Sequence, residues 1–391
     1  MDAVIQHPQT HAAASPPETN TFRFTREHFN PASVYAPPVS ELEHQLTALW
    51  EAVLNFDGIG IDDAFFEVGG ESFAAVTLFT EMERFLGEMP PLSILLDYPT
   101  IRLLAGYLEQ EGAAKHGLVS PVRAQGQRPV ALFSTHAGHG NVLFVRRLLA
   151  HIGAEQRLYA IRARGLQEGE TPHRDFAAMA ADYVDEVRRV QPDGPYLLSG
   201  NCVGGIIAFE MAHRLGDLGH DVAGVVMIDP EYHPNAVPWL YWRDPEAPAA
   251  RRRRALLRAI WFLRRKIRHY RDRLMNRPVI EYPAETGDNR RRQDAVMAGL
   301  GAALKAYRPR RYDGRVVILC SAERHRYLAN AALGWRAFAP NVEFIEIGGS
   351  HDEVFIDALP ALGKALDGVL VQAQPVIQQY QQPSQHRAAA E

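Results

Sequence analysis

The stretch that decides the fold is YLLSGNCVGG, residues 196–205. An apolar, strand-like run leads into G-x-C-x-G-G, and a helical pattern follows over residues 206–215. A sharp strand-to-helix turn strains the backbone and excludes large side chains, so glycines flank the residue at its apex. The pattern predicts that Cys202 occupies this apex, where the positive end of the helix favours an anionic sulfur. The alternative is that Cys202 is a small buried residue on a tight turn, a common use of free cysteine.

Short apolar runs alternate with amphipathic stretches on both sides of this turn. Because helical stretches separate the apolar runs, the pattern indicates a βα alternation and a mostly parallel sheet. Six strands are predicted, at residues 129–134, 157–161, 196–199, 222–228, 316–320 and 342–347.

Two further residues fall where such a sheet would place partners for Cys202. Asp229 closes the strand predicted at 222–228, and His351 follows the strand predicted at 342–347. The order nucleophile, acid, histidine, with each residue on a loop after a strand, is what the α/β-hydrolase fold requires. We therefore expect an enzyme with a Cys202–His351–Asp229 triad.

Other residues compete for these roles. The chain has sixteen histidines, so only the position after the last strand distinguishes His351. Asp352 and Asp193 are weaker candidates for the acid because neither closes a central strand. The second cysteine, Cys320, ends a predicted strand, and we expect it in the core.

A different pattern covers residues 39–112. Apolar residues at spacings of four, three and four predict a first amphipathic helix, and helical stretches follow at about 72–86 and 100–110. We expect a small bundle of three or four helices. The first helix carries its apolar stripe on Leu42, Leu46, Leu49 and Val53.

One serine in this bundle is placed for chemistry. The stretch DAFFEVGGES, residues 63–72, puts Ser72 directly after a Gly-Gly turn and at the start of a helix. The glycines let the loop turn and leave the approach to the hydroxyl clear. The alternative is that Ser72 only caps the helix that follows.

DAFFEVGGES resembles the phosphopantetheine-attachment signature of carrier proteins in nonribosomal peptide synthetases. Residues 35–43 resemble the entry to such carriers, and residues 97–105, DYPTIRLLA, resemble their last helix. The resemblance implies that Ser72 carries a covalent 4′-phosphopantetheine arm, which holds substrate as a thioester. It also implies a phosphopantetheinyl transferase and an upstream synthetase module or condensation domain as partners.

Residues 129–370 resemble the type I thioesterase domain of the same synthetases. The loop STHAGHG, residues 134–140, matches the place of that family's oxyanion loop. The resemblance implies that the backbone N–H groups of His136 and Val203 hold the tetrahedral oxyanion. Most members carry serine where this chain has Cys202. A metal site at His136 and His139 is disfavoured, since no carboxylate or cysteine lies at ligand spacing.

The expected fold class is a small all-α carrier bundle followed by an α/β-hydrolase fold with a helical lid. In chain order we expect a flexible leader at 1–38, a carrier domain at 39–112, a linker at 113–127, a hydrolase domain at 128–371 with its lid at about 231–310, and a disordered tail at 372–391.

Charge is distributed unevenly along the chain. Residues 251–273, in the predicted lid, contain eleven Arg or Lys and one acid, whereas residues 41–111 contain fourteen acids and two arginines. One hypothesis is that the basic lid helix attracts the acidic carrier. The alternative is a solvated helix face.

Composition excludes several classes of function. A net charge of −4 gives no overall reason to bind nucleic acid, and two cysteines favour a reducing cytosol over a disulfide framework. No charge-free apolar run reaches 18 residues, so we expect no membrane span and a cytoplasmic protein.

The sequence therefore predicts chain release in peptide or hybrid polyketide assembly, in which Cys202 takes an acyl or peptidyl group and passes it to an acceptor. Release would occur by cyclisation, aminolysis or hydrolysis. The rivals are an acyl shuttle between carrier proteins and a non-catalytic carrier scaffold.

Overall fold

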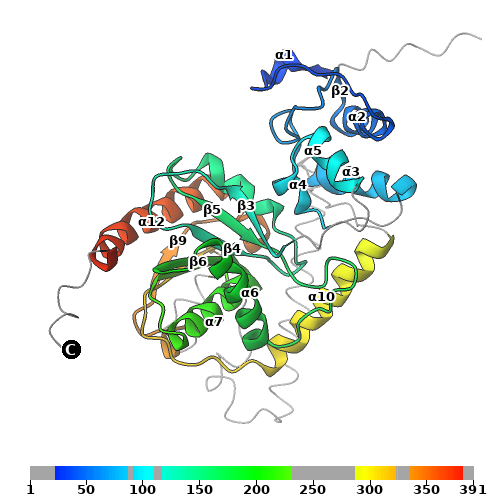
Figure 1. Ribbon diagram of the computed structural model, residues 1–391. Helices are drawn as coiled ribbons and strands as arrows, with labels where there is room; N and C mark the ends of the chain where they lie inside the picture. The colour runs from blue at the N-terminus through cyan, green and yellow to red at the C-terminus, as the bar shows by residue number, and fades with distance from the viewer. Residues whose placement is uncertain are drawn as a thin grey trace, which may run out of the picture.

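The computed structural model describes residues 23–86, 91–109, 117–230, 287–322, 324 and 335–381. A helical unit occupies the N-terminal part, and a larger unit with a central sheet follows it (Figure 1). The two units touch along one edge of the larger one.

The helical unit confirms the predicted bundle. Its helices are α2 (Glu41–Leu54), α3 (Ser72–Leu86), α4 (Ile94–Asp97) and α5 (Ile101–Leu108). Ser40 begins α2 with a capping box, in which its hydroxyl accepts from the N–H of Glu43 at 3.1 Å. The core is aromatic, with the rings of Trp50 and Phe65 packed edge to face at 5.0 Å.

The predicted leader at 1–38 is wrong over its described part. Strand β1 (Phe24–Thr25) pairs in parallel with β2 (Phe56–Asp57), and α1 (Arg26–Phe29) follows it. Arg26 hydrogen-bonds to the fully buried Asp63, and Phe29 packs on the helical core. Composition missed this segment because its order depends on satisfying a carboxylate far away in the sequence.

The larger unit is built on a seven-stranded sheet in the order β3-β5-β4-β6-β7-β8-β9. Only β3 is antiparallel to its neighbour, which confirms the predicted mostly parallel sheet. The strands are β3 (Val119–Arg123), β4 (Leu132–Thr135), β5 (Leu158–Ile161), β6 (Tyr196–Asn201), β7 (Val222–Ile228), β8 (Val316–Cys320) and β9 (Glu343–Glu346).

Helices cover both faces of this sheet (Figure 1). Helices α6 (Phe176–Val190), α7 (Val203–Asp217) and α10 (Gly287–Ala306) share one hydrophobic cluster with alternate strand residues such as Leu198. The 3-10 helix η1 (Leu143–Ala150) and α12 (Leu359–Gln381) share a second cluster with the intervening residues such as Leu197. Two further 3-10 turns are η2 (Trp335–Ala337) and η3 (His351–Glu353).

Two predicted boundaries need correction. Part of the predicted linker at 113–127 is strand β3, which was missed because Pro121 interrupts its short run and suits only an edge strand. The predicted tail at 372–391 is wrong over its first ten residues, because α12 continues to Gln381. The Ala and Gln residues of this stretch have good helix propensity, so they extend a helix that sheet packing already stabilises.

The predicted lid at 231–310 is described only in part. Residues 231–286, which include the predicted basic helix, lie outside the described residues. The described part is mostly α10, whose Val296, Leu300 and Ala303 are buried in the cluster beside α6 and α7. Among the helices that the structure describes, none combines the length and apolar character needed to cross a bilayer.

The two units share a small contact. Leu143 of η1 is buried in the hydrophobic core of the helical unit, and Leu96 packs against clusters of both units. At the end of α4, the carboxylate of Asp97 accepts a hydrogen bond from the hydroxyl of Ser120 in β3. Burial raises the pKa of Asp97 to about 6, although Ser120 and the charge of Arg162 oppose the shift.

This shift predicts a pH-dependent cost at the contact. Below the ordinary pKa of 3.8 the carboxyl is neutral in both states. The penalty on the folded state grows as pH rises from 3.8 to about 6 and is complete above that value. Asp97→Asn removes the charge but keeps an acceptor for Ser120. We expect it to raise the free energy of unfolding at pH 8 by about 2 kcal/mol and to change it little at pH 3.5. Urea titrations at both pH values measure this, and an equal gain at the two values would contradict it.

Candidate active site

Cys202 occupies the turn between β6 and α7. Its backbone has φ 57 and ψ −121, a left-handed conformation that side chains rarely adopt, and it stands as the N-cap residue of α7. The N–H of Cys202 donates to the carbonyl oxygen of Ile228 at 2.9 Å, which extends the β6–β7 ladder up to the turn. The predicted position of Cys202 at the apex is therefore confirmed.

Two glycines allow this turn. A Cβ atom on Gly200 would lie 2.2 Å from the carbonyl oxygen of Gly204, and one on Gly204 would lie 2.4 Å from the carbonyl oxygen of His136. The hydroxyl of Thr135 donates to the Gly204 carbonyl at 2.8 Å and joins β4 to the first turn of α7. Strand, turn and helix are thus in direct backbone contact.

The close contact between β6 and α7 predicts opposite effects on stability for alanine at Gly200 in β6 and at Gly216 in α7. Gly200→Ala forces the backbones of β6 and α7 apart, and we expect a loss of about 3 kcal/mol in the free energy of unfolding. The matched control is Gly216→Ala in α7, where no atom lies within 4 Å of the new Cβ. It should gain about 0.5 kcal/mol from helix propensity. Denaturant titration of both variants tests this, and equal effects would refute the close approach.

The structure joins the predicted acid to the predicted histidine. Asp229 follows β7 directly, with φ 42, and is fully buried. Its Oδ2 accepts from Nδ1 of His351, the first residue of η3, at 2.5 Å, and its Oδ1 accepts from the N–H of Ser321 at 2.8 Å. Asn201 and Ile228 are paired across β6 and β7, so Cys202 and Asp229 leave adjacent strands side by side.

Sequence reasoning missed Arg324. Its Nε lies 3.4 Å from Oδ2 of Asp229, and its Nη1 donates to the carbonyl oxygens of Asp229 and Pro230 at 2.8 and 2.6 Å. Burial alone would raise the pKa of Asp229, but the hydrogen bond from His351, the charge of Arg324 and the Ser321 N–H together lower it. No sequence signal distinguishes Arg324 from the other arginines of this chain.

The charge of Arg324 should therefore add to stability only where Asp229 is ionised. A lowered pKa contributes stability above the ordinary value of 3.8, which is lost as pH falls through the folded-state pKa. We expect Arg324→Met to lower the free energy of unfolding by about 2 kcal/mol at pH 7, and the deficit to shrink below pH 3.8.

A suitable control is Arg311→Met, which breaks an exposed pair with Asp313 and should cost less than about 0.5 kcal/mol. Unfolding free energies measured from pH 3 to pH 7 decide the point. A deficit for Arg324→Met that does not vary with pH would contradict the role of its charge.

The two backbone N–H groups predicted to hold the oxyanion lie in different environments. The N–H of His136 donates to the carbonyl oxygen of Ile161 at 2.9 Å, so the sheet already uses this donor, and its prediction as an oxyanion donor is wrong in this structure. The reason is that the β4–β5 ladder extends one residue beyond the predicted strand end. Val203 is the first residue of α7, where backbone N–H groups have no partner within the helix.

The imidazole of His136 anchors the loop that follows β4. Nδ1 donates to the carbonyl oxygen of Ala137 at 2.8 Å, which leaves Nε2 to accept from the hydroxyl of Tyr183 at 2.9 Å. Burial lowers the pKa of His136 to about 4, only partly offset by the bond to Ala137. The ring is therefore neutral and both nitrogens are engaged.

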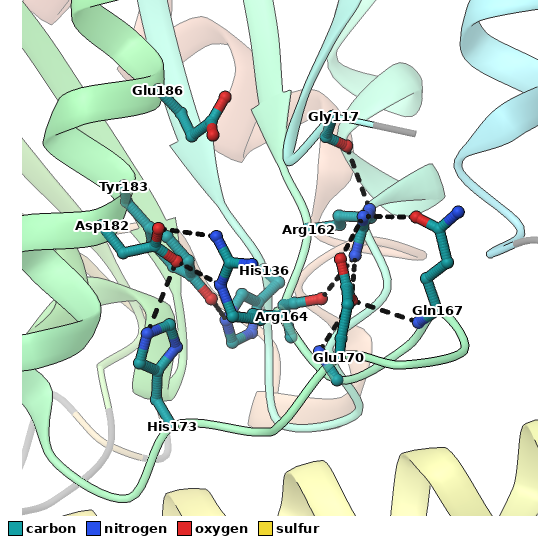
Figure 2. Close-up of polar contacts among 12 residues, drawn as sticks. Gly117, His136, Arg162, Arg164, Gln167, Glu170, His173, Asp182, Tyr183 and Glu186 are labelled. Atoms are coloured by element: carbon teal, nitrogen blue, oxygen red, sulfur yellow. Dashed lines mark hydrogen bonds and ion pairs between the residues drawn. The ribbon is translucent and has the colours of Figure 1, made fainter. Parts of the chain in front are cut away.

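Figure 2 shows the polar networks beside this loop, after the carboxyl end of β5. Arg162 is fully buried and pairs with Glu170 through two bonds of 2.8 Å. Arg164 pairs with Asp182 of α6 at 2.6 and 2.7 Å, and Nε2 of His173 lies 3.4 Å from the same carboxylate. These pairs fix the loop after β5 against α6, next to His136 on the loop that follows β4.

The structure also places the other residues that the sequence offered for these roles. Cys320 is fully buried, and burial, followed by the charges of Asp229 and Glu346, raises the pKa of its thiol to about 12. The prediction that it belongs to the core is confirmed. Asp193 is exposed and precedes β6, so it lies at the edge of the sheet opposite Cys202. Asp352 is the second residue of η3, and its side chain lies outside the described part.

Ser72 is the first residue of α3, and its neighbours Glu71 and Phe73 are exposed. Between residues 44 and 108 the sequence offers one other serine, Ser93, which is 1% exposed. A large transferase needs an accessible hydroxyl, so the position of Ser72 suits modification and that of Ser93 does not.

Comparison with protein families agrees with this division of the chain. Residues 44–108 match the family described as phosphopantetheine attachment site, and residues 130–248 match the thioesterase domain family. The chain carries a carrier domain followed by a thioesterase domain. The carrier domain is a site for 4′-phosphopantetheine on a serine, as the sequence resemblance implied.

Similar proteins are synthetases much longer than this chain. Malpinin synthetase of Mortierella alpina is 36% identical over 198 residues, which is 50% of this chain and 2% of the relative. Indigoidine synthase of Streptomyces lavendulae is 34% identical over 198 residues, or 50% of this chain and 15% of the relative. The dimodular nonribosomal peptide synthase of Bacillus subtilis is 36% identical over 194 residues, or 49% and 8%.

Two solved structures are also similar. A four-domain nonribosomal peptide synthetase in its holo form, bound to AMP and glycine, aligns over 90% of this chain and 27% of its own, with a TM-score of 0.49 and 26% identity. The NocB thioesterase domain, in covalent complex with a fluorophosphonate nocardicin G analogue, aligns over 64% and 99%, with a TM-score of 0.47 and 26% identity.

Proposed function

We propose that this chain releases a finished acyl or peptidyl chain in nonribosomal peptide or hybrid polyketide biosynthesis, through a Cys202–His351–Asp229 triad. The observation that carries the proposal is the 2.5 Å hydrogen bond between Asp229 and His351 at the same edge of the sheet as the Cys202 turn. A buried carboxylate that orients an imidazole near an activated residue is the arrangement needed for acyl transfer.

Ser72 is the proposed attachment residue for 4′-phosphopantetheine. It lies at the start of α3 between exposed residues, whereas Ser93 is buried. When bound, the arm supplies a thiol that presents the substrate acyl group as a thioester. The residues of the thioesterase domain do the rest of the chemistry.

In the first step, Cys202 attacks the carbonyl carbon of the substrate thioester. His351 takes the thiol proton on Nε2, because its Nδ1 is bound to Asp229. A new carbon–sulfur bond forms to Cys202, the original carbon–sulfur bond breaks, and His351 returns the proton to the departing thiol. Asp229, held ionised by Arg324 and Ser321, stabilises the charged imidazole between these transfers.

The tetrahedral intermediate needs donors for its oxyanion. We assign one to the N–H of Val203, at the first turn of α7, where the helix dipole adds to the hydrogen bond.

In the second step, an acceptor attacks the acyl group on Cys202, and His351 removes the acceptor's proton. The carbon–sulfur bond to Cys202 breaks, and His351 returns the proton to the Cys202 sulfur. Because the acyl-enzyme is a thioester, the acyl group stays as activated as it was on the arm. An oxygen ester would not conserve this activation. The acceptor we favour is an amine or a hindered internal hydroxyl, because simple hydrolysis needs no such activation.

A cytoplasmic setting, a phosphopantetheinyl transferase and an upstream synthetase module or condensation domain complete the proposal. The family matches support the context, since both domains occur in such synthetases. An acyl shuttle between carriers would use the same thiol. It is distinguished by its product, which is an acylated second carrier.

Cys202 substitutions test the proposal on one acyl substrate loaded onto the arm. Cys202→Ala should lower release at least about a thousandfold and leave the acyl group on the carrier. Cys202→Ser should still accept the group but shift products toward free acid. Intact-mass analysis shows where the group rests, and chromatography gives the product ratio. An unchanged rate and ratio in Cys202→Ser would refute the advantage of the thiol.

Iodoacetamide supplies a check that needs no substrate. One equivalent should label Cys202, and the Cys320→Ala control should be labelled equally, because burial raises the pKa of the Cys320 thiol to about 12. If Cys202 is not labelled, the remaining hypothesis is that the chain is a non-catalytic carrier scaffold.

A further inference from the structure

The carrier domain rests on η1 of the thioesterase domain. Leu143, the first residue of η1, is 4% exposed and belongs to the carrier core. Three residues later, the guanidinium of Arg146 lies 4.3 Å from the centre of the Phe66 ring. Burial lowers the pKa of Arg146, and the charge of Glu67 opposes the shift. One turn of η1 thus offers an apolar anchor and a cation to the carrier loop that precedes Ser72.

Arg147 donates one hydrogen bond to each domain. Its Nη2 donates to Oε2 of Glu71, the residue before Ser72, at 3.1 Å. Its Nη1 donates to the carbonyl oxygen of Phe355 at 3.0 Å. Phe355 lies four residues after His351, and its ring packs edge to face on Phe144 of η1 at 4.8 Å. A single side chain therefore joins the proposed attachment site to the segment that carries the proposed base.

We infer that η1 is the docking surface on which this chain's own carrier delivers its arm, and that Arg147 is a positioning residue linking the docked carrier to the His351 segment. The inference rests on the proposed function. It concerns how the carrier meets the thioesterase domain, and no residue in it touches the reacting atoms.

The chemistry of the two surfaces supports this assignment. The carrier region from residue 41 to residue 111 holds fourteen acids and two arginines, so two adjacent arginines on η1 complement it. A planar guanidinium can donate in two directions at once, which an ammonium group cannot do with the same geometry. The Glu71–Arg147 pair is partly exposed, with 71% and 25% of the side chains accessible, so it suits a contact that forms and breaks during turnover.

The decisive experiment is a charge swap in the full-length, arm-bearing protein. Glu71→Arg and Arg147→Glu should each slow transfer from the arm to Cys202 about tenfold, and the double variant should recover to within about threefold of the unchanged protein. The matched control is Glu41→Arg, an exposed acid at the start of α2. It should have no effect. Single-turnover quenching with intact-mass detection measures each rate after complete loading.

A soluble acyl-pantetheine thioester separates docking from chemistry. It reaches Cys202 without the carrier, so Glu71→Arg should leave its turnover unchanged. Arg147→Glu should lower that turnover about threefold, because the bond to Phe355 is lost. If the unchanged protein does not turn over this substrate, the proposed function fails and docking is decided by the next measurement.

Amide hydrogen exchange reads docking without any reaction. Glu71→Arg should speed exchange over residues 143–150 at least about threefold, and the swap should restore protection. Equal exchange in all variants, or single variants that slow transfer without recovery in the swap, would overturn the inference.

Discussion

The rest of the site depends on the backbone contact between β6 and α7. A Cβ atom on Gly200 would meet the Gly204 carbonyl, and one on Gly204 would meet the His136 carbonyl, so neither position has room for a side chain. The chain can turn there only because Cys202 accepts a left-handed conformation. The turn places a thiol at the positive end of α7 and at the carboxyl edge of the parallel strands. Asp229 reaches the same edge because β7 pairs with β6 in register up to that point.

The two thiols lie in contrasting environments. Cys320 ends β8 in the core, where burial and nearby carboxylates raise the pKa of its thiol to about 12. Cys202 is partly accessible and stands at a helix start. The carboxylate of Asp229 shows the effect of its environment in the other direction, since Arg324, Ser321 and His351 together outweigh the cost of burying it.

The sequence was enough to predict the features that depend on local, repeating patterns. Periodic apolar runs placed six strands and the carrier helices, and strand-end positions selected Asp229 and His351, which the structure joins. The sequence was not enough to predict features in which the role of one side chain depends on a residue far away in the chain. Arg26 orders the leader only because Asp63 is buried, Arg324 gains its role only through the fold, and the His136 N–H is consumed by a neighbouring strand. Strand β3 escaped because pairing with β5, more than its own composition, makes it a strand.

Because α5 and β3 are covalently connected, even a weak contact between the two domains can be occupied. About ten residues separate Leu108 from Val119, so the carrier experiences its partner surface at an effective concentration in the millimolar range. A contact of only a few side chains is then occupied for much of the time, yet it dissociates quickly. Under the proposed function, the same brief residence would let the carrier leave, collect its next cargo elsewhere and return to the surface where that cargo is discharged.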